Sequence, residues 1–155
     1  MEVRLERAGR LLHRRTERFG FRTFEVLLGE GFRLNGQRIL LKGVCRPSFR
    51  PATARTLSAQ DSREDVRTMK AMNANAVRAV HYPCDRHFLE ACDELGLLVV
   101  TEYLAWMSPL PDEPGKRLVR ELVTRDHNHP SIVMWANGNH KSFNPALEWE
   151  FKVHD

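Results

Sequence analysis

Ser131-Ile-Val-Met-Trp-Ala-Asn-Gly-Asn-His140 begins as a run of apolar and β-branched residues and ends in polar side chains. A short apolar run of this kind is typical of a strand that is buried on both faces. In α/β folds, the side chains that carry chemistry lie at the carboxyl ends of such strands. The stretch therefore predicts a buried strand over residues 132–136 that delivers Asn137, Asn139 and His140 to a functional edge of a sheet.

Three similar apolar runs precede this one, and segments with helical spacing separate them. The expected strands are residues 39–45, 76–80, 97–102 and 132–136, and the expected helices are residues 58–72, 85–95 and 115–126, with a last short helix from Pro145. Ser58 with Asp61 has the form of a capping box, and Gly96 suits a helix end. Regular alternation of strand and helix predicts an α/β fold with a parallel sheet and right-handed crossovers.

The N-terminal region has a different pattern, in which apolar and charged residues alternate. Residues 2–6 and 11–26 show this period of two around a turn at 7–10, which predicts a β-hairpin. An arginine-rich arm that binds phosphate backbones is the alternative, but an arm does not need the alternating apolar residues. A second, tight hairpin is expected over residues 32–39, because Asn35-Gly36 is a strong two-residue turn signal.

Composition limits the class of protein and its compartment. The chain has 155 residues, 42% of them hydrophobic, which suits one domain or pieces of two. There is no apolar run long enough to cross a membrane and no signal-peptide core, so we expect a cytoplasmic protein without a membrane partner. The net charge of +4 comes from basic residues interleaved with acidic ones, which favours a mixed surface over nucleic-acid binding.

Metal and cofactor sites are not expected. Cys45, Cys84 and Cys92 lack the paired spacing of zinc ligands and are read as free thiols. His127 and His129 share a loop but have no third ligand at a suitable spacing, so capping or packing is the favoured role. No glycine-rich phosphate-binding turn follows any expected strand, which argues against a nucleotide cofactor.

Polar side chains follow all four expected strands, and this convergence is typical of a barrel or doubly wound active site. The first strand is followed by Arg46, the second carries Arg78 and is followed by His81, and the third ends at Glu102. A buried carboxylate at Glu102 paired with Arg46 or Arg78 is favoured over a catalytic one. Trp106 and Trp135 are candidates for stacking on a ligand, but for Trp135, which lies inside an apolar strand, a place in the core is favoured.

Several motifs occur in the order of a known family. They are Phe19-Gly-Phe-Arg22, Phe32-Arg-Leu-Asn-Gly36 with Leu41-Lys-Gly-Val44, Asn73-Ala-Asn-Ala-Val-Arg78 with His81-Tyr-Pro83, Cys92-Asp-Glu-Leu-Gly-Leu97, and Asn128-His-Pro-Ser-Ile-Val-Met-Trp135 with Gly138-Asn139. With these motifs the chain resembles glycoside hydrolase family 2, which includes β-galactosidases, β-glucuronidases and β-mannosidases. The resemblance implies that residues 1–28 are the last strands of an immunoglobulin-like β-sandwich and residues 32–155 the first half of a (β/α)₈ TIM barrel. Such a barrel has eight strands and about 250 residues, and this sequence has room for about four βα units.

The same resemblance implies roles for individual residues. Family enzymes are retaining β-glycosidases that use one Glu as acid/base and a second as nucleophile. The acid/base position directly follows Gly-Asn and is His140 here, while the nucleophile position near the seventh strand lies beyond these residues. Asn139 matches the ligand of the sugar 2-hydroxyl, and Arg78, His81 and Tyr82 match positions that line the pocket.

The first strand exit departs from the family pattern of Asn-Arg/Tyr-His, because this chain has Cys45-Arg46-Pro47 and only Arg46 agrees. His140 can donate a proton near neutral pH but cannot replace a missing nucleophile, so we expect no hydrolysis by this chain alone. Three functions remain open. They are a split or truncated piece of a family 2 enzyme, a non-catalytic pseudoenzyme that binds a carbohydrate, and a half-barrel that joins a complementary half or a second copy.

Overall fold

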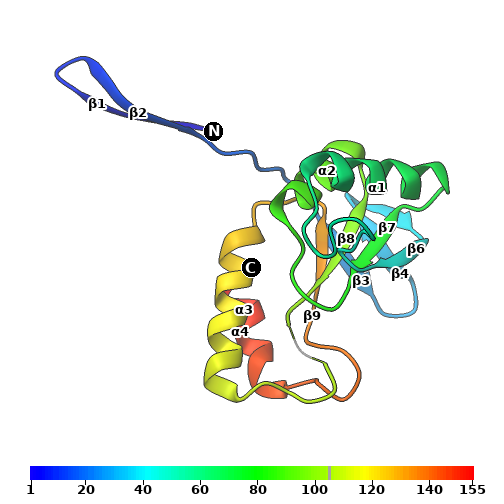
Figure 1. Ribbon diagram of the computed structural model, residues 1–155. Coiled ribbons are helices and arrows are strands. Elements are labelled where there is room, and N and C mark those ends of the chain that lie inside the picture. Colours follow the sequence, from blue (N-terminus) through cyan, green and yellow to red (C-terminus); the bar gives the residue numbers. More distant parts are fainter. Residues whose placement is uncertain (105) are drawn as a thin grey trace.

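A parallel sheet of four strands forms the centre of the computed structural model, which describes residues 1–104 and 106–155. The strands are β6 (Gly43–Arg46), β7 (Ala76–Ala79), β8 (Leu98–Glu102) and β9 (Ile132–Ala136), hydrogen-bonded in that order. The helices α1 (Ala59–Ala71), α2 (Arg86–Leu95) and α3 (Asp112–Asp126) connect them (Figure 1). The predicted α/β alternation is confirmed, and the arrangement is that of a partial barrel.

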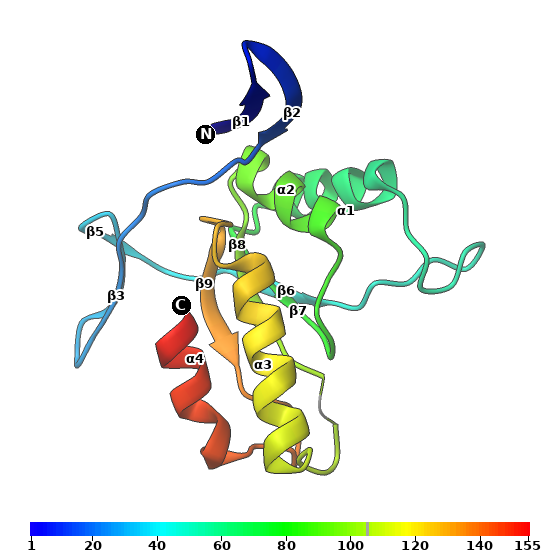
Figure 2. The same ribbon diagram turned by 90° about the vertical axis from the view of Figure 1, so that its left-hand side faces the viewer.

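The N-terminal hairpin consists of β1 (Glu2–Arg7) and β2 (Arg10–Thr16), and it projects away from the body in both ribbon views (Figures 1 and 2). The expectation that its second strand continues to residue 26 is wrong, because β2 ends at Thr16 and residues 17–23 form no strand. This connecting strap is held by the start of β9 instead. The Arg22 guanidinium donates to the carbonyls of Pro130 and Ile132, and a Cβ at Gly20 would lie 2.6 Å from Pro130 Cγ.

A separate antiparallel sheet contains β3 (Phe24–Leu27), β4 (Gly31–Leu34) and β5 (Gln37–Ile39). The tight hairpin predicted at Asn35-Gly36 is confirmed, with positive φ angles of 50° and 77° at these two residues. The apolar run at 39–45, expected as one strand, is divided between β5 and β6. The division between domains near residue 28 stays a prediction, and β3 on one side of it pairs with β4 on the other.

The helix boundaries follow their capping residues. The predicted capping box at α1 is confirmed: Ser58 Oγ accepts the Asp61 N–H, and Asp61 Oδ2 accepts the Ser58 N–H at 2.9 Å. Gly96 ends α2 in the left-handed conformation, at φ 71°. The helix α3 begins at Asp112 rather than at residue 115, because a proline such as Pro114 is tolerated in the first turn, where N–H groups have no intrahelical partner.

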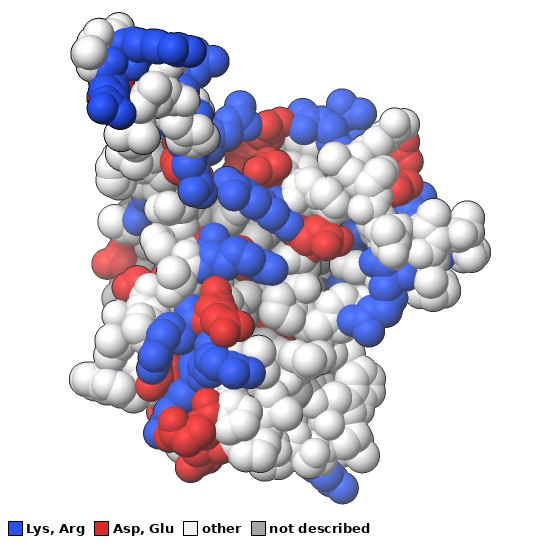
Figure 3. Space-filling model, turned by 60° about the vertical axis from the view of Figure 1, so that its left-hand side comes forward, with Lys and Arg blue, Asp and Glu red and all other residues white. Residues whose placement is uncertain are grey.

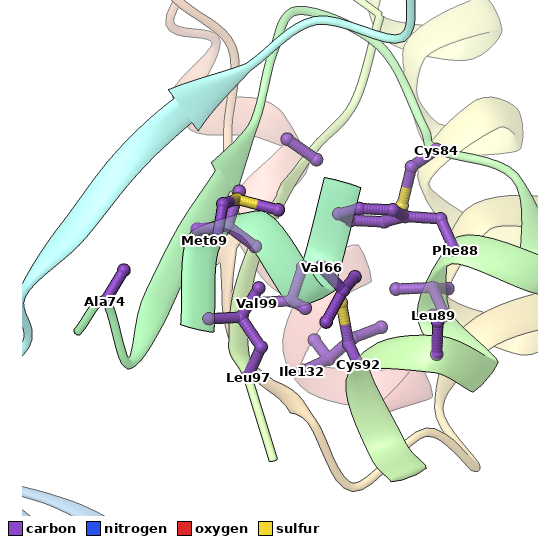
Figure 4. Close-up of a cluster of buried hydrophobic side chains, with 13 residues drawn as sticks. Val66, Met69, Ala74, Cys84, Phe88, Leu89, Cys92, Leu97, Val99 and Ile132 are labelled. Atoms are coloured by element: carbon purple, nitrogen blue, oxygen red, sulfur yellow. The ribbon is translucent and has the colours of Figure 1, made fainter. Parts of the chain in front are cut away.

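The core lies between the helices and one face of the parallel sheet. A first cluster packs α1 and α2 against the strands, with Phe88, Leu89, Val66 and Val99 fully buried (Figure 4). A second cluster joins α3 to the short 3₁₀ segment η1 (Pro145–Leu147) and to α4 (Glu148–His154). Trp135 packs against both clusters, in agreement with its expected place in the core. The other face of the sheet, turned away from these helices, carries polar side chains such as Arg78 and Glu102.

Charged residues of both signs alternate over the surface, as Figure 3 shows for one face. Many of them are paired, for example Arg63 with Glu94 at 2.6 Å and Arg120 with Glu150 at 3.4 Å. Exposed pairs of this type contribute little stability each, about 0–1 kcal/mol. No helix within residues 1–104 and 106–155 is long and apolar enough to cross a lipid bilayer.

The three cysteines differ in burial, which predicts a difference in reactivity. Cys84 and Cys92 are buried and Cys45 is exposed, and all three are free thiols. Burial raises the pKa of the Cys84 thiol to about 12 and shifts the pKa of Cys92 in the same direction. Since the thiolate is the reactive form, iodoacetamide at pH 8 is expected to alkylate only Cys45 in the folded chain.

Mass spectrometry of the intact protein measures this result, with urea-unfolded protein as the control that takes up three labels. The folded Cys45→Ser variant is expected to take up no label. Alkylation of Cys84 in the folded chain at the rate of Cys45 would contradict the packing.

Because the folded pKa of Cys84 lies above its unfolded value of 9.0, the free energy of unfolding should also fall as the pH rises from about 9 towards 12.

Candidate functional site

Strand register places the predicted polar side chains on one face of the sheet. Arg78 of β7 aligns with Val100 of β8. Neighbouring residues of a parallel pair point the same way, and side chains alternate along a strand, so Arg78 and Glu102 share a face. Val77 and Val99, which alternate with them, are buried in the core beneath the helices.

The Glu102 carboxylate is the centre of this face, and its side chain is 0% exposed. Its Oε2 atom accepts hydrogen bonds from Arg78 Nη2 at 2.7 Å and Nε at 3.1 Å. Its Oε1 atom lies 3.2 Å from His81 Nδ1. A buried carboxylate is costly unless it is paired, and the two hydrogen bonds from Arg78 compensate the charge. Of the two partners expected for Glu102, the structure supplies Arg78 and not Arg46.

Asn139 joins the cluster from the turn that follows β9. Its Nδ2 atom lies 2.7 Å from His81 Nδ1, and its backbone N–H donates to Ser142 Oγ at 2.7 Å. Gly138 has a φ of 85°, and a Cβ there would lie 2.6 Å from Ser142 Oγ. Only glycine fits at this point, so the turn holds the Asn139 side chain in a fixed direction.

The Asn139 amide is oriented by a contact with the adjacent backbone. The Asn139 Oδ1 atom accepts the backbone N–H of His140, which leaves the Nδ2 donor facing His81 Nδ1. His81 Nδ1 therefore lies between the Asn139 Nδ2 donor and the Glu102 Oε1 acceptor, and the tautomer of the ring decides which of the two it bonds.

Arg46 lies apart from the cluster, on the other face of the sheet. Cys45 is the residue of β6 that aligns with Arg78, so Arg46 points towards the helices. Its guanidinium donates to Asp65 Oδ2 at 2.7 and 2.9 Å and stacks on the Phe88 ring at 4.1 Å. These contacts give Arg46 a structural role, and its predicted contact with a substrate stays a prediction.

Tyr82 also faces the loop after β6 rather than Glu102. Its hydroxyl donates to the Ser48 carbonyl at 3.1 Å, and the Arg55 guanidinium covers its ring at 3.8 Å. His140 is exposed, and its backbone carbonyl accepts the N–H of Met107 at 3.1 Å. The structure thus brings together Arg78, His81, Glu102 and Asn139 of the predicted set, with His140 on the adjoining turn.

Two features of this region were not expected from the sequence. Ser142 was not singled out, and the only signal for it is a polar residue four positions after a glycine. Asn137, which follows β9 directly, donates to the Asn144 carbonyl at 2.7 Å and so supports the next loop. His129 has the packing role expected of it, with Nδ1 2.6 Å from Asp93 Oδ2. Within the described ranges, no three His, Cys, Asp or Glu side chains are grouped to hold a metal ion.

Comparison with known proteins places this arrangement in a class of enzymes. Residues 26–108 and 115–150 match the model of the TIM barrel domain of glycosyl hydrolases family 2. The chain is 36% identical over 152 residues to a putative β-glucuronidase of Formosa agariphila, covering 96% of this chain and 18% of that protein. It is 39% identical over 142 residues to a β-galactosidase of Halalkalibacterium halodurans, covering 79% of this chain and 14% of that protein.

Solved structures agree with this assignment. A β-glycosidase from Bacteroides vulgatus superposes with a TM-score of 0.87 at 29% identity, covering 99% of this chain and 22% of that one. The β-glucuronidase of Parabacteroides merdae gives a TM-score of 0.80 at 31% identity, covering 86% and 17% of the two chains. The chain belongs to glycoside hydrolase family 2, and it spans less than a fifth of the length of the two curated relatives named above.

The buried ion pair predicts a specific loss of stability. Replacing Arg78 by Met keeps the aliphatic stem but leaves the Glu102 carboxylate buried without its cation. We expect the free energy of unfolding to fall by about 2 kcal/mol in urea titrations. This is less than the loss for a fully buried pair, because the Arg78 side chain is 38% exposed and water screens part of the interaction.

Arg86→Met is the matched control, since Arg86 pairs with Glu90 on the surface of α2 at 54% exposure. Its expected cost is below about 0.5 kcal/mol. Adding Glu102→Gln to Arg78→Met should recover part of the loss, because the uncompensated charge is removed. Equal effects of Arg78→Met and Arg86→Met would show that the buried carboxylate does not depend on Arg78.

Proposed function

We propose that these residues form one wall of the sugar-binding site of a β-glycosidase and bind the hydroxyl groups of a β-glycoside. The observation that carries the proposal is the convergence of Arg78, His81 and Asn139 around the buried Glu102 at the carboxyl ends of three consecutive strands. Ligands of barrel enzymes bind at this edge. Fixed donors and acceptors there suit the hydroxyl groups of a pyranose.

Asn139 is the residue best suited to hold the sugar. Its amide nitrogen has two hydrogens, and the contact with His81 uses one of them. The second is then available to a ligand oxygen. Family resemblance assigns this position to the 2-hydroxyl, and a contact at that hydroxyl strengthens in the transition state of glycoside hydrolysis. The His81 imidazole provides a further hydrogen-bonding group beside it.

Hydrolysis by these residues alone is not part of the proposal. A retaining glycosidase uses two carboxyl groups about 5–5.5 Å apart, one as acid/base and one as nucleophile. The acid/base position is His140 here, and Glu102 is fully buried against Arg78, which makes it unsuited to attack an anomeric carbon. The four strands of the sheet provide no second carboxylate beside Asn139, so a nucleophile has to come from another part of a barrel.

The range of sugars follows from the relatives rather than from the site. The named relatives are β-galactosidases and β-glucuronidases, which makes β-galactosides and β-glucuronides the candidate ligands. Arg78 is already bound to Glu102, so it is not a free cation for the carboxylate of a glucuronide. The sugar ring is therefore expected to be recognised through its hydroxyl groups.

A second candidate function is assembly of a barrel from two halves. In the described sheet, β6 and β9 are the outer strands, and each has one unpaired edge. Large apolar side chains are exposed in the segments next to these strands, including Leu40 before β6 and Phe143 after β9. Unpaired edges flanked by apolar side chains favour pairing with four further strands, from a complementary half or a second copy.

Binding and turnover can be measured separately. Titration of the isotope-labelled chain with methyl β-D-galactopyranoside and methyl β-D-glucuronide is expected to give saturable shifts in its NMR spectrum. Asn139→Ala should weaken binding about tenfold, the equivalent of one hydrogen bond. Asn128→Ala is the matched control, because Asn128 is an exposed asparagine before β9, at the other end of the strand.

The chain is expected to cleave p-nitrophenyl β-D-galactopyranoside no faster than the substrate hydrolyses spontaneously in buffer without protein. Turnover that disappears in His140→Ala would contradict the proposed lack of hydrolysis. A chain that binds neither glycoside, although folded by circular dichroism, would contradict the sugar-binding function itself.

A further inference from the structure

Trp106 lies beside the polar cluster and takes no part in the core. It follows β8 by four residues, and 56% of it is exposed to solvent. Burying a large aromatic ring is favourable, so an exposed tryptophan next to convergent polar groups suits a ligand-binding surface. The hydrogen bonds within the polar cluster do not account for an exposed indole beside it.

The indole is in direct contact with the cluster through His81. The two ring centroids are 4.0 Å apart and the ring planes meet at 78°, which is an edge-to-face arrangement. The same imidazole contacts Asn139 Nδ2 and Glu102 Oε1 through its Nδ1 atom. The indole therefore contacts His81 directly, and His81 links it to Asn139 and Glu102.

The segment that carries the indole is attached to the turn that carries Asn139. The N–H of Met107 donates to the carbonyl of His140 at 3.1 Å. The backbone N–H of His140 donates in turn to Asn139 Oδ1. This chain of contacts holds the aromatic ring and the amide in a fixed relation, which a composite binding surface requires.

Three other aromatic rings near the strand ends are already occupied. Tyr82 has the Arg55 guanidinium over its ring at 3.8 Å. Tyr103 is buried in the cluster of α3 and α4, and Trp135 packs against both hydrophobic clusters. Of these four aromatic residues, Trp106 combines solvent exposure with contact to the polar cluster.

We propose that Trp106 is the stacking surface for the pyranose ring whose hydroxyls bind Asn139 and His81. One face of a β-glycoside ring is lined by C–H groups, which pack favourably on the electron-rich face of an indole. The polar groups fix the edge of the sugar while the indole buries its apolar face. The inference rests on the proposed sugar-binding function and names the apolar half of the same site.

The test uses the whole chain with its tryptophan indoles labelled with nitrogen-15 and methyl β-D-galactopyranoside as the probe. In the unsubstituted protein, the indole Nε1–H signal of Trp106 should shift on titration, while that of Trp149, 70% exposed on α4, should not. Saturation transfer should be strongest at the C–H protons of one face of the sugar. Trp106→Ala is expected to weaken binding about five- to tenfold, and Trp106→Phe less than twofold.

Trp149→Ala is the matched control, since it removes an exposed indole from another surface and should leave affinity unchanged. If the unsubstituted chain binds the glycoside while the Trp106 signal stays still and Trp106→Ala binds equally well, this inference is overturned and the sugar-binding function stands. A folded chain that does not bind the glycoside overturns both. The indole shift is measured without substitution, so the test does not depend on the folding of Trp106→Ala.

Discussion

The Glu102 carboxylate has no solvent contact, and the polar face of the sheet depends on this constraint. A charge in that position is stable only beside a cation with good geometry, and Arg78 provides two hydrogen bonds to one of its oxygens. This pairing requires β7 and β8 to keep their register, because a shift of one residue would turn Arg78 to the helix side. The polar cluster and the strand register therefore support each other.

His81 and Asn139 extend this constraint to the turn that follows β9. The imidazole lies between the Glu102 carboxylate and the Asn139 amide, and the amide is held by the turn at Gly138. A site built in this way is organised before a ligand arrives, which lowers the entropy cost of binding. The exposed indole of Trp106 adds an apolar surface to a set of groups that is otherwise polar.

Patterns that depend on local structure could be predicted from the sequence. The strand and helix alternation, the hairpin at Asn35-Gly36 and the capping box at Ser58 follow from side-chain periodicity and turn chemistry, and the structure contains all three. The pairing of Glu102 with Arg78 was one of two expected alternatives. A buried acid at a strand end needs a nearby cation, and the sequence alone left Arg46 and Arg78 as candidates.

Features that depend on contacts distant in sequence could not be predicted. The strap at 17–23 looks like a continued strand, but Arg22 binds carbonyls more than 100 positions away. The direction of Arg46 depends on a register shared with β7, and a difference of one residue decides whether it faces the site or Asp65. Ser142 supports Asn139 through a turn that only the folded chain reveals.

A crystal structure of the chain with methyl β-D-galactopyranoside or methyl β-D-glucuronide tests the central claim most directly. The account predicts a pyranose at the carboxyl ends of β7, β8 and β9, with hydroxyl oxygens about 3 Å from Asn139 and His81. Glu102 should remain bound to Arg78 beneath the sugar. A glycoside bound elsewhere, or a ligand at this edge that leaves Asn139 and His81 without a contact, would contradict the account.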